Sequence, residues 1–566
     1  MKFITSEVAV FMGKRSSHRN LRLLLRFLAI LLGVICLYSI SFHFMMAREN
    51  QSFSWMTGFY WTLTVMSTLG FGDITFQSDL GRVFSILVLV TGMVFLLVLF
   101  PFTLIEFFYA PWVAAQNRAR APRELPADTS GHVIITNYDP VTTTLIRKLE
   151  QYGYPYALLV GELEQALRLV DEGYRVVVGD PDLPDTYTKL RLEKALLVTA
   201  TGSDVENTNI AFTVRELSRS VSIVSTASSE SAAEILKLAG SSHVFQLGEL
   251  MGRSLARRTI GGDAVTHVIG HFDQLIIAEA TVTGTPLVGK TLSESKLRAI
   301  AGVNVIGVWD RGEFKVANPD TKITSHTVLV MSGSTEHFRR YDELFCIYHQ
   351  VEAPVIIIGG GRVGRAIGKA LDSRNQDYRI VELIPERVQR FGNNAIIGDA
   401  ADLEVLEKAG IREAPAVIIT SHDDDTNVYL TIFCRKLRPD IQVISRSTRD
   451  RNVSTLHRAG ADFVMSYASM GANIIFNWLK RNDILMVAEG LNIFRVKVPE
   501  ALVGKSLAGA SLRKETGCHV IAVQSQGQMR INPDPAQPLE SGQEIVLISD
   551  ADAEKKFFER YGVNSG

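Results

Sequence analysis

Cysteine and net charge are both scarce in this sequence, and each shortage narrows the classes of protein to which the chain can belong. Only four of the 566 residues are cysteine, at positions 36, 346, 434 and 518, and no two form a C-x-x-C pair. We therefore expect neither a disulfide framework nor a zinc site, and a reducing cytosol suits the chain. The formal net charge is −1. Without a basic excess, the chain is not expected to bind nucleic acid.

Apolar residues are abundant instead, and they are concentrated in the first 110 residues. Hydrophobic residues make up 46% of the chain, and the mean hydropathy is +0.13. Residues 21–46 and 82–108 are each long enough to cross a bilayer, and basic residues flank both on the same side, among them Arg15, Arg19 and Arg118. We therefore expect a multi-pass protein of the cell (inner) membrane with both termini in the cytoplasm. The remaining length predicts several soluble domains.

The loop between the two spans contains the run Thr68-Leu69-Gly70-Phe71-Gly72-Asp73. It resembles the selectivity filter of potassium channels, in which backbone carbonyls replace the hydration shell of K⁺. Gly70 and Gly72 can adopt a positive φ, and the Thr68 hydroxyl can supply the innermost oxygens. Residues 52–66 are rich in aromatic side chains, end directly before the run and resemble a re-entrant pore helix. The alternative is a glycine-containing turn beside an interfacial aromatic belt.

A filter of this type needs four loops around one axis, so the resemblance implies a homotetramer in a lipid bilayer. The second span would line the pore, and within it Gly92 resembles the gating-hinge glycine of the family. Pro101 has no N–H, and its ring clashes with the carbonyl of Leu97 in a regular helix. The sequence therefore predicts a kink or break between Leu97 and Pro101. The alternative is that neighbouring helices and local adjustments absorb the proline.

Residues 110–130 are rich in Ala, Arg and Pro and are interpreted as a linker, after which short apolar strands alternate with amphipathic helices. Such alternation predicts a parallel, doubly wound sheet. The turn after the first strand, Asn137-Tyr138-Asp139-Pro140, has no glycine where a dinucleotide site needs three. Gly179-Asp180 ends the third strand, where Rossmann-type folds touch a nucleotide. We expect a Rossmann scaffold with a lost or altered pocket, in which Asp180 is the remaining candidate contact.

A second unit of the same kind carries a nucleotide fingerprint. The predicted strand 355–358 is followed by Gly359-Gly360-Gly361-Arg362-Val363-Gly364, which satisfies G-x-G-x-x-G. The three glycines permit a tight turn, close approach to a pyrophosphate, and close packing of helix on strand. Glu382 ends the next strand and would accept from ribose hydroxyls, which favours NAD over NADP. Asp399 and Ala400, after the third strand, complete the candidate site. ADP, ATP and AMP stay open as ligands because the loop recognises phosphates.

An acidic run follows the fourth strand of this unit, and its carboxylates Asp423, Asp424 and Asp425 are candidate Ca²⁺ ligands. The run lacks a full set of ligands. The alternative is a solvated loop in which Asp or Thr caps a helix.

The two soluble halves repeat one another. Residues 287–292 (LVGKTL) match 502–507 (LVGKSL), and Asn-Pro-Asp at 318–320 recurs at 532–534. The chain is therefore expected to contain two copies of one two-lobed unit. The predicted domains are an N-terminal segment (1–20), a pore module (21–109, with its filter at 68–73), a linker (110–130), a first N-lobe (131–260) and C-lobe (261–340), and a second N-lobe (341–482) and C-lobe (483–566).

The whole pattern resembles potassium channels gated by RCK (also called KTN) domains. The resemblance implies a two-span α-helical pore module followed by two α/β RCK units, each with a Rossmann-like lobe and a small α+β lobe. In a tetramer these units would form a cytoplasmic gating ring that couples NAD or ADP binding to pore opening. In the calcium-gated prototype of the family, acidic residues end the fifth strand. The matching residues here are Ser225-Thr226-Ala227 and Ser445-Arg446-Ser447, so that calcium site is expected to be absent, and Ca²⁺ remains only a candidate ligand elsewhere.

Two other classes of protein share parts of this pattern. A membrane-anchored NAD-dependent oxidoreductase would need an acid–base His, Tyr or Lys near the nicotinamide, and no such constellation stands out. A regulatory component of a K⁺ transporter would have no pore of its own. We therefore expect a ligand-gated channel and not an enzyme.

Overall fold

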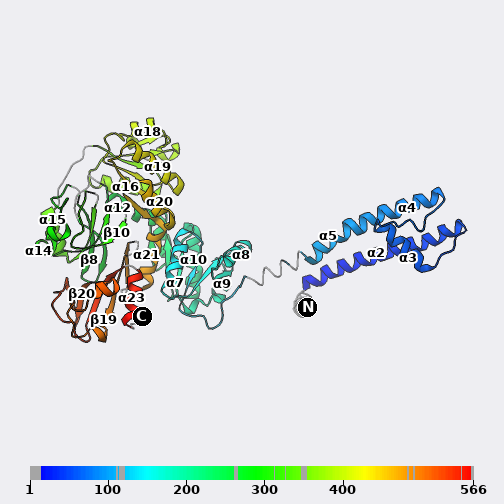
Figure 1. Ribbon diagram of the computed structural model, residues 1–566, viewed down its shortest axis with the longest axis horizontal. Coiled ribbons are helices and arrows are strands. Elements are labelled where there is room, and N and C mark those ends of the chain that lie inside the picture. The colour runs from blue at the N-terminus through cyan, green and yellow to red at the C-terminus, as the bar shows by residue number, and fades with distance from the viewer. Residues whose placement is uncertain are drawn as a thin grey trace. The chain divides into compact units, whose positions relative to one another are not determined.

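The computed structural model describes most of the chain. The described residues are 15–109, 113, 121–259, 266–282, 284–310, 313–325, 327–345, 353–389, 391–480, 484–488, 491–549 and 551–561. The chain forms two compact units, one of Met1–Pro122 with Leu163–Gly173 and the other of Arg123–Glu162 with Tyr174–Gly566. Figure 1 shows the helices and strands of both.

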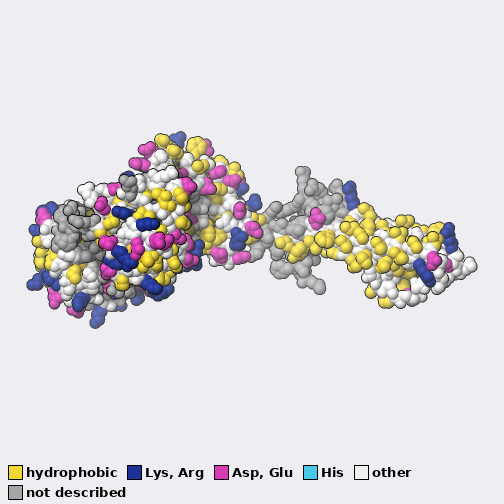
Figure 2. Space-filling view, turned by 90° about the horizontal axis from the view of Figure 1, so that it is seen from above, with side chains coloured by type: hydrophobic (Ala, Val, Ile, Leu, Met, Phe, Trp, Pro, Cys, Tyr) yellow, Lys and Arg dark blue, Asp and Glu magenta, His cyan; other side chains and the backbone are white. Residues whose placement is uncertain are grey.

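Apolar helices make up the N-terminal unit up to residue 109. They are α2 (Arg15–Arg48), α3 (Trp55–Met66), α4 (Asp79–Gly92), η1 (Met93–Leu99), α5 (Phe100–Leu104) and η2 (Ile105–Tyr109). Two stretches, Leu24–Arg48 and Asp79–Leu104, are long and apolar enough to cross a membrane. Many large apolar side chains on them are exposed, and Figure 2 shows hydrophobic side chains over much of the visible face of these helices. A continuous apolar surface of this extent suits lipid rather than water.

A buried aromatic cluster holds the helices of this unit together. Phe42 of α2 lies 4.9 Å from Trp61 of α3, and Trp61 stacks on Phe84 of α4 at 5.8 Å between ring centroids. Phe76, from the loop before α4, meets Trp61 edge to face at 5.3 Å. Aromatic rings bury large apolar areas and prefer such offset or edge contacts. The cluster therefore fixes α3 between the two long helices.

The first N-lobe is a parallel sheet of six strands in the order β3-β2-β1-β4-β5-β6. Its strands are β1 (His132–Ile135), β2 (Tyr156–Val160), β3 (Val176–Val178), β4 (Ala195–Ala200), β5 (Ser222–Thr226) and β6 (His243–Phe245). The helices between and after them are α7 (Pro140–Gln151), α8 (Leu163–Asp171), α9 (Pro184–Lys189), η3 (Leu192–Lys194), α10 (Asp204–Leu217), α11 (Glu230–Leu238) and α12 (Leu247–Ala256). The chain order reverses between β1 and β4, and in such sheets ligands bind at this switch point.

The second N-lobe repeats this topology, with the order β14-β13-β12-β15-β16-β17. Its strands are β12 (Val355–Ile358), β13 (Tyr378–Glu382), β14 (Ala395–Ile397), β15 (Ala416–Ile419), β16 (Gln442–Ser447) and β17 (Phe463–Ser466). Its helices are α16 (Arg362–Asp372), α17 (Pro385–Val388), η4 (Gly392–Asn394), α18 (Leu403–Lys408), α19 (Asp424–Leu437), η5 (Asp450–Asn452), α20 (Val453–Ala459) and α21 (Tyr467–Lys480). The predicted fold class, with doubly wound parallel sheets in both units, is confirmed.

Each C-lobe is built on an antiparallel sheet, of order β10-β9-β11-β8-β7 in the first unit and β18-β19-β22-β20-β21 in the second. The first contains β7 (His267–Phe272), β8 (Leu275–Thr281), α13 (Leu292–Ser295), α14 (Leu297–Ile300), β9 (Asn304–Asp310), β10 (Glu313–Val316), β11 (Thr327–Gly333) and α15 (Thr335–Phe345). The second contains β18 (Ile484–Ala488), β19 (Leu491–Lys497), η6 (Glu500–Leu502), α22 (Leu512–Thr516), β20 (His519–Ser525), β21 (Gln528–Ile531), β22 (Glu544–Ser549) and α23 (Ala551–Tyr561). One apolar core includes Ile277 and Val330 of the first lobe and Ile521 and Val546 of the second, so the two sheets pack together.

The two N-lobes of the chain contact one another through helices. Helix α12 packs on α16, and α7 packs on α21. Glycines allow the close approach: a Cβ at Gly252 would lie 2.8 Å from the carbonyl oxygen of Val363, and one at Gly471 would lie 2.7 Å from Val141. The N-lobe pair is thus one body with an extensive helical interface.

A buried polar cluster joins the first N-lobe to the second C-lobe. The Tyr152 hydroxyl donates to Glu554 at 2.8 Å, and the Asn492 amide donates to the same oxygen at 2.9 Å. Glu554 is 3% exposed, and burial raises the pKa of its carboxyl above the ordinary value. The cluster therefore ties α7 to β19 and α23.

Candidate ion filter and nucleotide site

The predicted filter has the backbone that its glycines permit. From Thr68 onward every second residue has a positive φ, with 64° at Thr68, 45° at Gly70 and 74° at Gly72. The backbone N–H groups of Leu69 and Gly70 both donate to the carbonyl of Thr64, at 3.0 and 3.2 Å. Residues 68–73 are exposed on the single chain. The segment is thus anchored to the end of α3 at one side and is open at the other.

Aromatic residues of α3 hold the outer part of this segment. The Tyr60 hydroxyl donates to the Asp73 carboxylate at 3.0 Å, and its ring stacks on Phe71 with centroids 6.5 Å apart. The indole N–H of Trp61 donates to the carbonyl of Ile74 at 3.2 Å. The aromatic content of 52–66 therefore supports the loop directly, a role that an interfacial belt would not have.

The inner helix is not broken between Leu97 and Pro101. Leu99 (φ −68°, ψ −37°) and Phe100 (φ −64°, ψ −51°) are helical, so the predicted break is wrong, whereas the predicted kink stays a prediction. The segment Met93–Leu99 is instead a π-helix, and the N–H of Phe100 donates to the carbonyl of Phe95, five residues earlier. The wider π-turn relieves the clash of the proline ring with the carbonyl four residues before it. The alternative, a local adjustment that absorbs the proline, describes what is found.

Gly92 lies where the inner helix touches the pore helix. A Cβ at this position would lie 2.5 Å from the carbonyl oxygen of Met66 and closer still to its Cα. The backbone at Gly92 is helical (φ −59°, ψ −47°). The lack of a side chain at Gly92 therefore serves close packing behind the filter, and its role as a gating hinge stays a prediction.

The second N-lobe places its three fingerprint glycines in distinct surroundings. Gly359 has φ 102°, in the left-handed region that favours glycine. A Cβ at Gly364 would overlap the carbonyl oxygen of Gly359, which leaves no room for any side chain. Gly361 caps α16 with φ −69°, and nothing lies within 4 Å of a Cβ built there. Gly359 and Gly364 thus shape the turn, and Gly361 faces open space at the positive end of a helix, as a pyrophosphate site requires.

Glu382 closes the base of this turn. Its carboxylate accepts from the N–H of Gly360 at 2.7 Å and from the N–H of Ile384 at 3.0 Å, and it is 6% exposed. The Arg387 guanidinium lies 3.8 Å away. Each carboxylate oxygen can accept a further bond. Glu382 therefore positions the glycine loop in addition to any role toward a ribose.

The remaining candidate residues of the nucleotide site, Asp399 and Ala400, follow β14 at the same edge of the sheet as Glu382. The N–H of Gly398 donates to the carbonyl of Glu382 at 3.1 Å, so Asp399 and Ala400 follow directly beside β13. The Asp399 carboxylate accepts from the N–H of Ala401 at 2.9 Å, and Ala400 is buried. Val363 is buried and Arg362 is exposed at the start of α16.

The first N-lobe has an acidic side chain where the second has open glycine. The Asp139 carboxylate accepts from the N–H of Thr142 at 2.8 Å, in the first turn of α7, and from the hydroxyl of Thr201 at 2.8 Å. The positive end of α7 is therefore already neutralised by the chain itself. Asp180 accepts from the N–H of Asp182 at 3.0 Å and thus shapes its own turn.

The acidic run of the second N-lobe does not form the predicted metal site. Asp423 caps α19 and accepts from the N–H and the hydroxyl of Thr426, at 3.0 and 2.6 Å. The buried Asp424 accepts from the N–H groups of Thr448 and Arg449 and from the amide of Asn452, at 2.6, 3.1 and 2.7 Å. No group of three or more His, Cys, Asp or Glu among the described residues is arranged to hold a metal ion. The capping alternative is confirmed.

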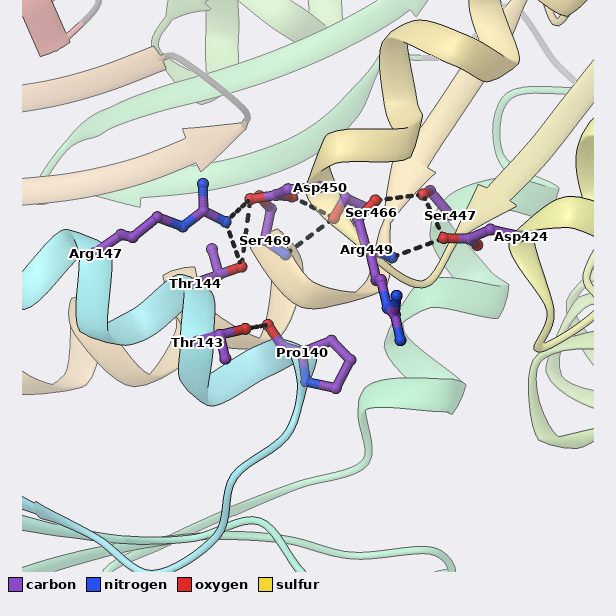
Figure 3. Close-up of polar contacts among 10 residues, drawn as sticks. All are labelled: Pro140, Thr143, Thr144, Arg147, Asp424, Ser447, Arg449, Asp450, Ser466 and Ser469. Carbon is purple, nitrogen blue, oxygen red and sulfur yellow. Dashed lines mark hydrogen bonds and ion pairs between the residues drawn. The ribbon is translucent and has the colours of Figure 1, made fainter. Parts of the chain in front are cut away.

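A polar chain that the sequence does not announce leads from this run to the first N-lobe (Figure 3). The backbone N–H of Arg449 donates to the Asp424 carboxylate. The next residue is Asp450, and its carboxylate accepts hydrogen bonds from the hydroxyls of Ser466 and Ser469, both at 2.5 Å. The same carboxylate pairs with the Arg147 guanidinium of α7 at 3.3 Å. Arg147 and Asp450 are 303 residues apart in sequence, and no local motif marks the pair.

Comparison with known proteins assigns each part of the chain. The sequence model described as "Ion channel" matches residues 27–108, "TrkA-N domain" matches 133–247 and 355–467, and "TrkA-C domain" matches 277–345 and 491–562. These matches define a class in which a channel domain precedes two TrkA-N/TrkA-C units, the RCK units of the resemblance above. Both channel-domain helices and the apolar surface around them mark a membrane protein.

Individual relatives narrow the class. The solved "GsuK channel bound to NAD" is 37% identical, with 96% of this chain and 100% of that chain covered and a TM-score of 0.61. "Probable potassium channel protein 2" of Methanocaldococcus jannaschii is 26% identical over 39% of this chain and 70% of its own length. A "Trk system potassium uptake protein TrkA homolog" of Pyrococcus horikoshii is 29% identical over 35% of this chain and 92% of its own. The chain belongs to the family of two-span channels with tandem RCK units that includes the GsuK channel.

Proposed function

We propose that this protein is a homotetrameric K⁺ channel of the cell membrane whose opening depends on a nucleotide bound by the second N-lobe. One observation carries the proposal: the same chain holds a Thr68–Gly72 segment with positive φ at every second residue and a glycine cradle open at Gly361. The exposed face of the filter segment is complete only when four copies surround one axis. Both termini lie in the cytoplasm, and the outer surface of the helical unit contacts lipid.

NAD is the proposed ligand. Gly361 leaves space for a pyrophosphate at the positive end of α16, and Glu382 ends the neighbouring strand where a ribose would lie. The GsuK channel, which this chain resembles over 96% of its length, has been solved bound to NAD. ADP shares the phosphates and ribose and is the second candidate for the same cradle. The first N-lobe takes no nucleotide at the matching turn, because the Asp139 carboxylate occupies the start of α7 and would repel a phosphate.

The polar chain of Figure 3 supplies a route from this cradle to the first N-lobe. A ligand that moves the start of α19, where Asp424 lies, also moves Arg449 and Asp450, and the Asp450 carboxylate pairs with Arg147 of α7. The first N-lobe in turn holds the end of the linker: the N–H of Leu125 donates to the carbonyl of Lys189 at 3.1 Å, and the Lys194 ammonium donates to the carbonyl of Ala127 at 2.9 Å. The segment leading toward the inner helix is thus attached to the lobe that the nucleotide site contacts.

The coupling needs only modest energy at each site. A ligand shifts a gate only by its difference in affinity between the open and closed states. Allosteric coupling is typically about 1–3 kcal/mol per site, so four sites in a tetramer can change the open-to-closed ratio by several orders of magnitude.

Flux through the purified full-length protein in liposomes tests the proposal. We expect K⁺ flux that exceeds Na⁺ flux and that changes when NAD is added to the cytoplasmic side. K⁺ flux that changes with neither NAD nor ADP would refute regulation by a nucleotide but would still support the channel function. Absence of K⁺ flux in liposomes that contain the assembled tetramer would refute the channel function itself.

A further inference from the structure

A cavity of about 600 Å³ lies between the two N-lobes of the chain. The first N-lobe contributes its carboxyl edge, Thr201–Asp204 after β4 and Thr226–Ser229 at the end of β5, together with the start of α12. The second N-lobe contributes the side of α16, through Arg362, Arg365 and Lys369. A volume of this size accommodates a small-molecule ligand.

The α16 wall of the cavity carries uncompensated positive charge. Arg362, Arg365 and Lys369 are spaced by three and four residues, so they share one face of the helix, and all three are exposed. Among the described residues none of the three makes a salt bridge, and the charges that Arg362 faces include His422 and Arg446, which are of like sign or neutral. The cavity therefore brings cations together without a protein anion to pair with them.

The two carboxylates of the cavity wall are already engaged. Asp204 accepts from the N–H of Ser228 at 2.9 Å and from its hydroxyl. Glu249 pairs with Arg253 on α12 at 3.0 Å. Glu249 is therefore compensated by a cation of its own helix, whereas Asp204 keeps its charge. The three cations of α16 face this one uncompensated carboxylate, so the lining stays net positive.

The opposite wall is made of hydroxyl groups. The Ser203 oxygen accepts from the N–H of Glu206, which leaves its own hydrogen free to donate into the cavity. Ser229 and Thr201 line the same edge. Hydroxyls and guanidinium groups together recognise phosphate oxygens, and arginine does so with paired hydrogen bonds. The same strand ends, Thr226–Ser229, lack the carboxylates that a calcium ion requires.

We propose that this cavity is a second ligand site, which binds a small molecule with two or more phosphate charges between α16 and the first N-lobe. Such a ligand would bridge the two N-lobes of one chain by neutralising the cations on one wall and accepting from hydroxyls on the other. The site goes beyond the nucleotide cradle, with which it shares only Arg362. Binding here depends on Arg365 and Lys369, whereas binding in the cradle depends on Gly361.

Calorimetric titration of the purified full-length protein with inorganic tripolyphosphate tests the site, since this probe has phosphates and no nucleoside. We expect binding by the wild type that falls about tenfold or more in R365A/K369A, because at least one charge-assisted contact is lost. The control K408A/K436A removes the same charge from exposed positions outside the cavity and should stay within about twofold of the wild type. Both pairs are exposed, and thermal unfolding verifies that each variant is folded.

A second arm separates the two sources of phosphate. In the G361A background, which closes the cradle, ADP is compared with pyrophosphate. Tighter binding of ADP identifies a nucleotide as the ligand, and equal binding identifies a free phosphate chain; both support the site. Tripolyphosphate affinity equal in the wild type and R365A/K369A would overturn the proposal, as would no binding of tripolyphosphate, pyrophosphate or ADP in the G361A protein.

Discussion

The substitution Gly361→Ala tests the nucleotide cradle with little disturbance of the fold. Its φ of −69° is ordinary for any residue, and a Cβ there meets no atom within 4 Å. Replacing glycine by alanine stabilises by about 0.4–1 kcal/mol through the unfolded state, and a helix N-cap disfavours alanine by a similar amount. The free energy of unfolding should therefore change by less than about 1 kcal/mol.

The effect on NAD should be much larger than the effect on stability. The added methyl group occupies the space through which a pyrophosphate approaches the first turn of α16, so one or two charge-assisted hydrogen bonds are lost. At about 1.5–3 kcal/mol each, this loss weakens NAD binding roughly 10-fold to more than 100-fold. Calorimetric titration of the purified full-length protein measures the affinity, and the NAD dependence of K⁺ flux in liposomes should shift by the same factor while K⁺ selectivity is unchanged.

Gly364→Ala is the matched control for this experiment. A Cβ at Gly364 overlaps the carbonyl oxygen of Gly359, so the strand and α16 must separate. Overpacking of this kind costs about 1–3 kcal/mol or more, and thermal unfolding should report it. The reasoning fails if G361A binds NAD with wild-type affinity, or if G361A is destabilised as strongly as G364A.

Three further predictions concern other parts of the chain. Gly92→Ala inserts a Cβ against Met66 and should lower K⁺ flux at every NAD concentration, whereas Gly33→Ala, which meets no atom within 4 Å, should not; equal flux in the two variants would refute a packing role. Asp450→Asn weakens the bond to α7, so NAD should bind with unchanged affinity and alter K⁺ flux less; a full response would exclude this route. The pKa of Glu554 is raised, so its carboxyl binds a proton more tightly in the folded than in the unfolded protein. The contribution of the protonated carboxyl to the free energy of unfolding is complete below about pH 4.5 and is lost as the pH rises through the pKa of the folded state. The melting temperature should therefore fall between pH 4.5 and 7, and Glu554→Gln should make this fall smaller. An equal fall in the wild type and the variant would contradict the prediction.

The features that could be predicted from the sequence are those that depend on the backbone preferences of neighbouring residues. A positive φ at Gly70 and Gly72 and a tight turn at Gly359 were expected because glycine adopts such backbone conformations without strain. The doubly wound sheets followed from the alternation of apolar strands with amphipathic helices. The duplication, visible as repeated short phrases, predicted that both units would share a topology. Each of these features depends on residues that are close in sequence, so it could be predicted before any tertiary contact was known.

The tertiary structure decided what depends on residues distant in sequence. The sequence predicted a kink or break between Leu97 and Pro101, but it could not show that the helix continues through a π-turn. The sequence predicted Asp424 as a candidate metal ligand. In the structure its carboxylate instead accepts three hydrogen bonds from residues that follow β16. The pairing of Arg147 with Asp450 exists only because α7 packs on α21.

By itself, therefore, the sequence predicted two membrane spans, a filter-like segment between them and one intact nucleotide fingerprint in a duplicated body of two similar units. Only the tertiary structure showed which of these parts touch: Met66 lies against Gly92 behind the predicted filter, and the cations of α16 face the hydroxyl edge of the first N-lobe. The physical reason is that backbone preference acts over a few residues, whereas packing and charge act between surfaces that folding brings together.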